Sequence, residues 1–322
     1  MKLHIKVFTS IFLSVSPVAF AEYPDKQITM VVPYAPAGST DVMGRILAQT
    51  MSKNLGQPMV VDNTGGAGGT IGALRVVRAP ADGYTILFHN MAQAASPALY
   101  SKLSYDPQTD FSAIGVVNDV PMVLVARKDF PANSLQGLID YIKANPGKLN
   151  FANAGVGSTS NLCEVLMKSS LSADWTSISY KGTGPALNDL LAGQVDVICD
   201  QPASTLQHIK GGNLKALAVA TKERISSLPQ TPTFSQSGMP GFQLTVWHGL
   251  YAPKNTPKPV IDRLVASLNT ALKDPLLVQR FTEMDAMIVP PSSATPAYLR
   301  NFLKGDVERW RIALKNVGIK PE

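Results

Sequence analysis

Two segments of the chain, far apart, repeat one design of strand, small-residue loop and helix start. The first runs I-T-M-V-V-P-Y-A-P-A-G-S-T-D from Ile28, and the second runs N-F-A-N-A-G-V-G-S-T-S-N from Asn150. In each, a short apolar run ends in Ala and Gly, and Ser or Thr then opens a stretch with helical periodicity. A strand that passes through a short loop into a helix is half of a βαβ unit, so the repeat predicts α/β folding with parallel strands.

The same loops predict where a ligand binds. The first N–H groups of a helix have no partner within the helix and carry partial positive charge, and small side chains let an anion approach them. We therefore expect one carboxylate to be held from two sides, by residues 37–40 and by residues 157–160. The alternative is two ordinary strand-to-helix turns, capped by Ser39 and Thr40 and by Ser158, Thr159 and Ser160.

The N-terminus carries the features of an export signal. Lys2 and Lys6 precede an apolar stretch at residues 7–15, and Ala19-Phe20-Ala21 fits the small-x-small rule for cleavage. The apolar run is too short to cross a bilayer, which takes about 20 residues. We therefore predict a signal peptide over residues 1–21 and a mature protein in the periplasm.

The composition indicates a globular chain of two domains. With 322 residues, 45% hydrophobic and 16% charged, the chain is long for one core and has no disordered tail. Its formal net charge of +6 suits a small anionic ligand, and no run of Lys and Arg indicates nucleic-acid binding. We expect a monomer without a cofactor or metal.

The two cysteines leave two alternatives open. Cys163 and Cys199 stand apart from any C-x-x-C motif, which argues against metal binding or thiol redox chemistry. In an oxidising compartment they either pair or remain two buried small hydrophobic residues. Both fall in the segment between the two predicted domain crossings, so we expect them in the same lobe.

Strand and helix patterns alternate along the chain, which predicts doubly wound sheets. The predicted strands are Ile28–Val32, Met59–Val61, Tyr84–Phe88, Phe151–Ala154, Ser177–Tyr180, Val195–Asp200 and Leu214–Ala220. The predicted helices are Thr40–Leu55, Thr70–Ala79, Ser134–Ala144, Ser160–Ser169, Thr183–Ala192, Pro257–Lys273, Pro275–Met284 and Thr295–Val317.

Two places in this pattern predict crossings between domains. Strand pieces at residues 114–117 and 122–126 are separated by Asn118-Asp119-Val120-Pro121, and a second crossing lies near residues 244–251. A chain that leaves one domain, builds another and returns forms a hinged clamshell. We predict lobe 1 from residues 22–119 and 247–322, and lobe 2 from residues 120–246.

The chain resembles the solute receptors of the tripartite tricarboxylate transporters, the extracytoplasmic binding proteins expanded in Bordetella. The resemblance covers essentially all of the mature chain. It rests on ordered motifs: Tyr23-Pro24-Asp25-Lys26-Gln27-Ile28, Val31-Val32-Pro33-Tyr34-Ala35-Pro36-Ala37-Gly38, Gly56-Gln57-Pro58, the loop Gly65–Gly69, Ala79-Pro80-Ala81-Asp82-Gly83-Tyr84, Tyr105-Asp106-Pro107, Asn145-Pro146-Gly147-Lys148-Leu149, Tyr180-Lys181-Gly182, Leu228-Pro229-Gln230-Thr231-Pro232-Thr233 and Trp247-His248-Gly249-Leu250-Tyr251-Ala252-Pro253.

The resemblance implies a two-lobed periplasmic binding protein, or Venus flytrap, with two crossover strands as the hinge. It implies capture of a small carboxylate between the lobes, delivery to the membrane permease of a tripartite tricarboxylate transporter, and no catalysis. Mapped onto this chain, the expected ligand-binding residues are Tyr34, Ala37, Gly38, Ser39, Thr40, Asp41, His89, Asn90, Gly157, Ser158, Thr159, Ser160, Tyr180, Gly182 and Asp200.

Two departures from the family pattern bear on the ligand. Ser39 stands where the family often has a second Gly, and Asn161 stands where it often has His. Ser39 adds a hydroxyl donor, and Asn161 removes a titratable group. Resemblance to a terephthalate receptor favours an aromatic dicarboxylate such as terephthalate.

Two other classes of function share parts of this pattern. An exported enzyme is disfavoured because Gly66-Ala67-Gly68 lacks the third glycine of a dinucleotide loop, and neither G-x-S-x-G nor H-E-x-x-H occurs. A periplasmic partner that presents a ligand to a two-component system would share the same fold. Asp200 is an unusual partner for an anion, and it is expected to orient a water molecule or to accept a proton or amine from the ligand.

Overall fold

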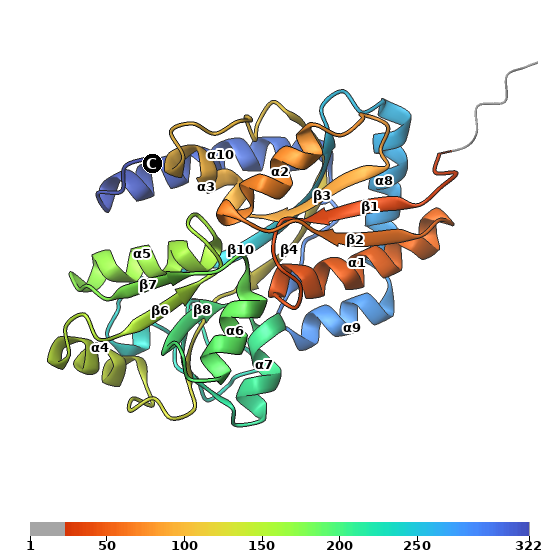
Figure 1. The fold of residues 1–322 in the computed structure, drawn as a ribbon. Helices are drawn as coiled ribbons and strands as arrows, with labels where there is room; N and C mark the ends of the chain where they lie inside the picture. Colours follow the sequence, from red (N-terminus) through yellow and green to blue (C-terminus); the bar gives the residue numbers. More distant parts are fainter. Residues whose placement is uncertain (1–22, 322) are drawn as a thin grey trace, which may run out of the picture.

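The computed structural model describes residues 23–321, and the predicted signal peptide lies outside this range. The chain forms two lobes, each built around one sheet with helices on both faces (Figure 1). The fold is therefore the predicted two-lobed α/β architecture.

The first sheet has six strands in the order β11-β4-β10-β3-β1-β2. They span β1 Ile28–Val32, β2 Met59–Asn63, β3 Thr85–Asn90, β4 Phe111–Pro121, β10 Thr245–Pro253 and β11 Met287–Ile288. Its helices are α1 Ser39–Leu55, α2 Thr70–Val77, α3 Ala92–Leu99, α8 Lys258–Ala271, α9 Pro275–Glu283 and α10 Pro296–Asn316, with a short 3-10 turn η1 at Ala67–Gly69.

The second sheet has five strands in the order β7-β6-β8-β5-β9. They span β5 Val123–Arg127, β6 Asn150–Asn153, β7 Thr176–Ser179, β8 Val197–Asp200 and β9 Leu214–Val219. Its helices are α4 Leu135–Ala144, α5 Thr159–Leu171, α6 Thr183–Leu191 and α7 Pro202–Lys210, with a 3-10 turn η2 at Ser235–Ser237.

Both sheets are mixed, because the connecting strands run against their neighbours. In the first sheet β1 pairs in parallel with β2 and β3, whereas β10 is antiparallel to β3 and β4. In the second sheet β6 pairs in parallel with β7 and β8, whereas β5 is antiparallel to β8 and β9. The repeated strand-loop-helix units thus form the parallel part of each sheet.

The predicted break at Asn118–Pro121 is wrong. Strand β4 runs unbroken to Pro121, and the interruption falls at Met122, immediately before β5. The polar residues that suggested a break are held across the ladder, because Asn118 Oδ1 bonds His248 Nδ1 at 2.8 Å and Asp119 Oδ2 accepts from Thr245 Oγ1 at 3.0 Å. The two crossings lie side by side, with Thr245 opposite Pro121.

Helices α3 and α7 were not predicted. Helix α3 contains Pro97, and α7 begins with Pro202 at its first turn, where a missing N–H costs nothing. Helix α3 follows β3 and helix α7 follows β8, each after a short connection.

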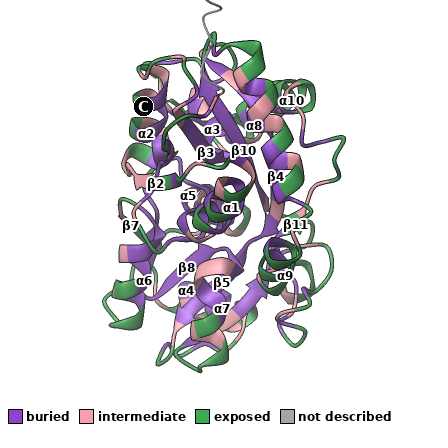
Figure 2. Ribbon diagram, turned by 90° about the vertical axis from the view of Figure 1, so that its right-hand side faces the viewer, coloured by how far each residue is buried: buried purple, intermediate pink, exposed green. Residues whose placement is uncertain are grey.

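Alternating strand residues place the core on both faces of each sheet. In β1, Met30 and Val32 pack with α1, α8 and α9, whereas Val31 packs with α2, α3 and α10. In β5, Leu124 packs with α4 and α5, whereas Val123 packs with α6 and α7. Figure 2 shows the strands buried, and the outward faces of the helices exposed. One cluster continues from the first sheet into the second through the crossings, which joins the lobes at the hinge.

The cysteines pair. Cys163 on α5 and Cys199 on β8 form a disulfide, with their Cα atoms 6.3 Å apart. The bridge lies within the second lobe, and it ties the helix that follows one predicted ligand loop to the strand that ends at Asp200.

Candidate ligand-binding cleft

The two small-residue loops meet at one cavity between the lobes. The first loop leads from β1 into α1, whose N-cap is Gly38, and the second leads from β6 into α5, whose N-cap is Ser158. The cavity is lined by Tyr34, Gly38, Ser39, Thr40 and Asn90 from the first lobe and by Ala154, Thr159, Thr183, Asp200 and Gln201 from the second.

Four helices begin at this cavity rather than two. Besides α1 and α5, helix α6 begins at Thr183, and Gln201 is the N-cap of α7. Of the described residues that line the cavity, none is Lys or Arg. An anion here is therefore met by unpaired helical N–H groups and hydroxyls, with the positive end of each helix dipole directed at it. Ala154, Thr183 and Gln201 are the lining residues that the sequence interpretation missed.

The lobes touch across the cavity. The hydroxyl of Ser39 lies 2.9 Å from Ser204 Oγ and 3.3 Å from Asp200 Oδ2. The space enclosed is about 10 Å³, room for about one water molecule. A carboxylate ligand must therefore displace these bonds between Ser39 and the second lobe.

Asp200 is a buried carboxylate inside a site built for anions. Burial raises its pKa to about 6, although hydroxyls of Ser204, Ser39 and Thr183 and the Gln201 N–H favour the charged form. The carboxyl group thus changes charge close to neutral pH. When protonated it donates a hydrogen bond, and when ionised it accepts one.

A chain of buried polar groups holds Thr40. Its hydroxyl lies 3.3 Å from His248 Nε2, and the other ring nitrogen of His248 lies 2.8 Å from Asn118 Oδ1. Burial lowers the pKa of His248 to about 3, so the ring is neutral. With Asn118 as acceptor, Nδ1 carries the proton and Nε2 accepts from Thr40. In the sequence His248 stands only within a family motif, and nothing in the local pattern indicates this supporting role.

Tyr34 ties the glycine-rich loop to the cleft. Its hydroxyl lies 3.0 Å from the carbonyl oxygen of Gly68 and 3.2 Å from Asn90 Oδ1. His89 packs edge-on against the Tyr34 ring and accepts the Asn90 N–H through Nδ1. Burial lowers the pKa of His89 to about 3. His89 therefore lies behind the lining residues Tyr34 and Asn90 as a neutral support.

Asp41 shapes the first loop from within. It accepts the N–H of Ala37 at 2.9 Å, and it bonds Asn63 Nδ2 at 2.8 Å and Arg45 at 3.0 Å. Ala37 itself adopts a left-handed backbone with φ of 64°, an uncommon conformation for a residue with a side chain. Both residues lie beside the cavity, and their bonds hold the loop that presents Gly38 and Ser39.

We expect Asp41→Ala to lower the free energy of unfolding by about 2 kcal/mol, because it removes the charge-assisted hydrogen bonds that the buried Asp41 carboxylate accepts from Ala37 N–H and Asn63 Nδ2. Asp62→Ala is the matched control, since Asp62 forms an exposed ion pair with Arg75, and such a pair contributes at most about 1 kcal/mol. Denaturant unfolding of both variants measures the difference. Equal losses would contradict a loop-shaping role for Asp41.

The second loop is also held by its own side chains. The N–H of Gly157 donates to Asn161 Oδ1 at 3.0 Å, and the N–H of Ala154 donates to Ser160 Oγ at 2.7 Å. Ser158 caps α5 by accepting the Asn161 N–H. Of the predicted residues in this loop, Thr159 lines the cavity, while Gly157, Ser158 and Ser160 stand beside it.

Tyr180 and Gly182 lie at the rim. The Tyr180 hydroxyl donates to Asp189 at 2.6 Å, and its ring lines an open groove with Val156 and Lys181. Gly182 is the N-cap of α6 and lies against Ala35 of the first lobe. Neither residue lines the enclosed cavity.

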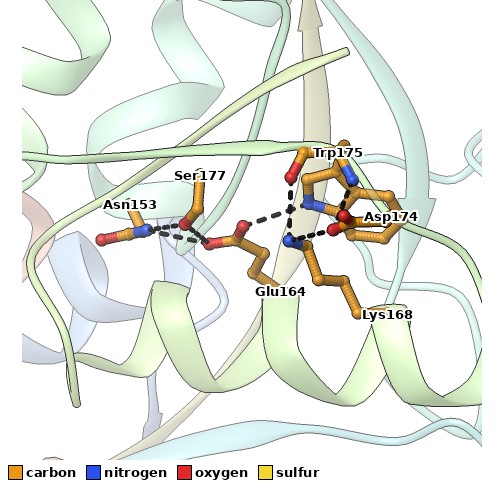
Figure 3. Close-up of polar contacts among 6 residues, drawn as sticks. All are labelled: Asn153, Glu164, Lys168, Asp174, Trp175 and Ser177. Atoms are coloured by element: carbon orange, nitrogen blue, oxygen red, sulfur yellow. Dashed lines mark hydrogen bonds and ion pairs between the residues drawn. The ribbon is translucent and has the colours of Figure 1, made fainter. Parts of the chain in front are cut away.

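A buried acid anchors the helix that carries the second loop (Figure 3). Glu164 on α5 is almost completely buried and accepts from Asn153 Nδ2 at 2.8 Å, Ser177 Oγ at 2.9 Å and Trp175 Nε1 at 3.1 Å. Asn153 in turn accepts the N–H of Gly155 at 2.9 Å. The Glu164 carboxylate is thus linked through one amide to the loop at the cleft.

A larger cavity of about 770 Å³ lies on the hinge side of the molecule. Its walls come from the crossings, from residues 220–226 and from α9, β11 and α10. Of the fifteen ligand-binding residues expected from the sequence, none lines it. The cleft cavity brings seven of them together from both lobes, so we assign the candidate site there despite its smaller size.

Two further properties concern the described residues 23–321 only. They contain no helix long and apolar enough to cross a membrane. They also contain no group of three His, Cys, Asp or Glu side chains placed to hold a metal ion.

The fold and the cleft define a two-lobed solute-binding receptor. Among solved structures, the chain is similar to the periplasmic binding protein BugD at a TM-score of 0.91 and 44% identity, covering 93% of this chain and 100% of BugD. MatC from Rhodopseudomonas palustris, solved with bound malate, gives a TM-score of 0.87 at 36% identity, with 91% and 100% covered. Protein BugT of Bordetella pertussis is 38% identical, over 95% of this chain and 93% of BugT.

The chain belongs to the family described as the tripartite tricarboxylate transporter family receptor, whose model matches residues 43–319. The members of this family are receptors and not enzymes, as the sequence predicted.

Two further solved structures are similar to this chain. A second Rhodopseudomonas palustris protein, solved with adipate, gives a TM-score of 0.87 at 31% identity, with 93% of this chain and 100% of that protein covered. A relative from Polaromonas, solved with no ligand, gives 0.61 at 25% identity, with 91% of this chain and 99% of that protein covered.

Proposed function

We propose that the chain is a periplasmic receptor that captures a small dicarboxylate between its lobes and delivers it to the membrane permease of a tripartite tricarboxylate transporter. The observation that carries the proposal is the convergence of four helix N-termini, from both lobes, on one cavity whose described lining residues include no Lys or Arg. Malate and adipate, the ligands of two similar proteins, belong to the same chemical class.

The proposed receptor closes like a clamshell about its two crossings. Its lobes comprise residues 22–119 with 247–322 and residues 120–246, and it works as a monomer exported by the signal peptide 1–21. The pairing of β4 with β10 beside the crossings supports this hinge. Each lobe supplies about half of the groups that line the cavity, so a ligand gains its full set of bonds only in the closed form.

Two kinds of dicarboxylate are proposed as ligands. Terephthalate, an aromatic dicarboxylate, follows from the sequence resemblance. A hydroxy-dicarboxylate such as malate is favoured by Asp200, because a ligand hydroxyl can donate to the buried carboxylate that would repel a second anionic group.

Thermal unfolding with terephthalate, malate and adipate tests the proposal. A ligand that binds only the folded protein raises the free energy of unfolding by about 2.7 kcal/mol at a hundredfold excess over its Kd. The diol or diester that matches each acid is the control and should have no effect. Chromatography of the incubated ligand should return it unchanged. Failure of every dicarboxylate to stabilise the protein, or the appearance of a product, would refute the receptor proposal.

A further inference from the structure

The glycine-rich segment Gly65–Gly69, which the sequence interpretation left without a function, lies against the other lobe. A Cβ atom placed on Gly68 would lie 2.2 Å from the carbonyl oxygen of Val156, and its three nearest atoms all belong to the loop after β6. Real Cβ atoms essentially never approach another atom below 3.0 Å. The backbone of one lobe therefore approaches the other more closely than any side chain would allow.

The second lobe contributes glycines to the same contact. A Cβ on Gly182 would lie 2.5 Å from Ala35 N, and a Cβ on Gly184 would lie 2.1 Å from the carbonyl oxygen of Pro36. We call the contact formed by Gly68, Gly182 and Gly184 the closure seam. At each of them the three nearest atoms belong to the opposite lobe.

Hydrogen bonds along the closure seam also join the lobes. The N–H of Ala35 donates to the carbonyl oxygen of Lys181 at 3.0 Å, and the Tyr100 hydroxyl donates to the carbonyl oxygen of Val156 at 2.6 Å. None of these four residues lines the ligand cavity. The seam therefore stabilises the closed arrangement without contacting the ligand.

We propose that Gly184 is a positioning residue that sets ligand affinity by permitting the lobes to close. Two of the seam glycines have positive φ, Gly68 at 60° and Gly182 at 153°, so a side chain there would be strained in any state. Gly184 has no such requirement and lies in the first turn of α6. Outside its own helix and chain neighbours, no atom of its own lobe comes within 3.6 Å of its added Cβ.

Gly184→Ala therefore separates closure from folding. With the lobes apart, Ala is accommodated and favours the helix over Gly. With the lobes together, its methyl group overlaps the Pro36 carbonyl. The matched control is Gly305→Ala, a helical glycine on α10 whose added Cβ meets nothing within 4 Å. This inference rests on the proposed function for its affinity measurement, but not for its measurement of closure.

The first measurement needs no ligand. Hydrogen exchange of the Ala35 amide reports the bond to Lys181, and we expect exchange about tenfold faster in Gly184→Ala, in proportion to the lost closed population. Denaturant unfolding of the unliganded variant should lie within about 1.4 kcal/mol of the wild type, the free energy that corresponds to a tenfold loss of the closed population. The Gly305→Ala variant should keep the wild-type exchange rate.

The second measurement is calorimetric binding of malate and terephthalate. For a probe that binds the wild type, Gly184→Ala should raise Kd about tenfold, whereas Gly305→Ala should leave it unchanged. If neither probe nor any other dicarboxylate binds the wild type, the proposed ligand class is wrong and exchange alone decides on the closure seam. Equal Ala35 exchange in the two variants, with equal Kd where a probe binds, would overturn the role of Gly184.

Discussion

Replacing Cys163 and Cys199 together by Ala is expected to lower the free energy of unfolding by about 4 kcal/mol. The bridge closes a loop with a sequence separation of 36 residues. In the chain-entropy model, cross-linking a loop of that length removes about 3.8 kcal/mol of conformational freedom from the unfolded chain at 25 °C. For a protein of ordinary stability this is a large fraction of the total.

Reduction of the wild-type protein separates the bridge from the packing of its sulfur atoms. Both cysteines are completely buried, so the Ala variant also loses apolar contacts, whereas the reduced protein keeps them. Denaturant unfolding should therefore give a loss of about 3 kcal/mol or more for reduced wild type, and no effect of reductant on the double Ala variant. A shift below about 1 kcal/mol on reduction would contradict the prediction.

The sequence was sufficient for the fold where local patterns and tertiary contacts agree. The strand, small-residue loop and helix at Ile28 and at Asn150 each became part of the parallel portion of a mixed sheet, because an apolar strand buried on both faces needs only its helices to cover it. The break expected at Asn118 failed because that residue is completely buried and bonded to His248, 130 positions away along the chain. A partner at such a distance leaves no local signal.

The candidate site was predicted in part for the same reason. Gly38, Ser39, Thr40 and Thr159 line the cavity because the start of a helix after a strand fixes both their position and their chemistry. Thr183 and Gln201 were missed because their place at the cleft depends on how the sheet of the second lobe is ordered. Asp41 was expected to bind the ligand, but its carboxylate instead accepts hydrogen bonds from Ala37 N–H and Asn63 Nδ2 within the first lobe.

The pH dependence of stability gives the second large effect, and it follows from Asp200. Its pKa is raised from an unfolded value near 3.8 to about 6 in the folded protein. Between these two values the folded protein holds the proton that the unfolded chain has lost, so the contribution of Asp200 to stability falls as pH rises. A rise of about two in this pKa corresponds to about 3 kcal/mol of unfolding free energy. This stabilisation is lost by about pH 6, and stability does not change further through Asp200 above that pH.

Asp200→Asn isolates this effect from other titrating groups. His89 and His248 have pKa values lowered to about 3, and they destabilise the protein as pH falls through about 6.5, which is the opposite direction. The contribution of the two histidines is the same in the wild type and in Asp200→Asn, so it cancels when the unfolding free energies of the two proteins are subtracted. Unfolding free energies of the two proteins should be measured from pH 4 to pH 8. The difference, variant minus wild type, should increase by up to about 3 kcal/mol as pH rises, with most of the increase by pH 6.

The same proton should appear in ligand binding. A dicarboxylate without a hydroxyl donor, such as terephthalate or adipate, favours the neutral form of Asp200 in the cavity, so its binding above pH 6 takes up one proton, and its affinity should fall by up to about tenfold per pH unit. Calorimetry in two buffers of different ionisation enthalpy counts that proton directly. In Asp200→Asn the uptake should vanish, because no other titratable side chain among the described lining residues changes charge in this range. Wild-type binding without uptake would show that Asp200 stays ionised beside the ligand, and uptake that persists in the variant would place the proton on another group.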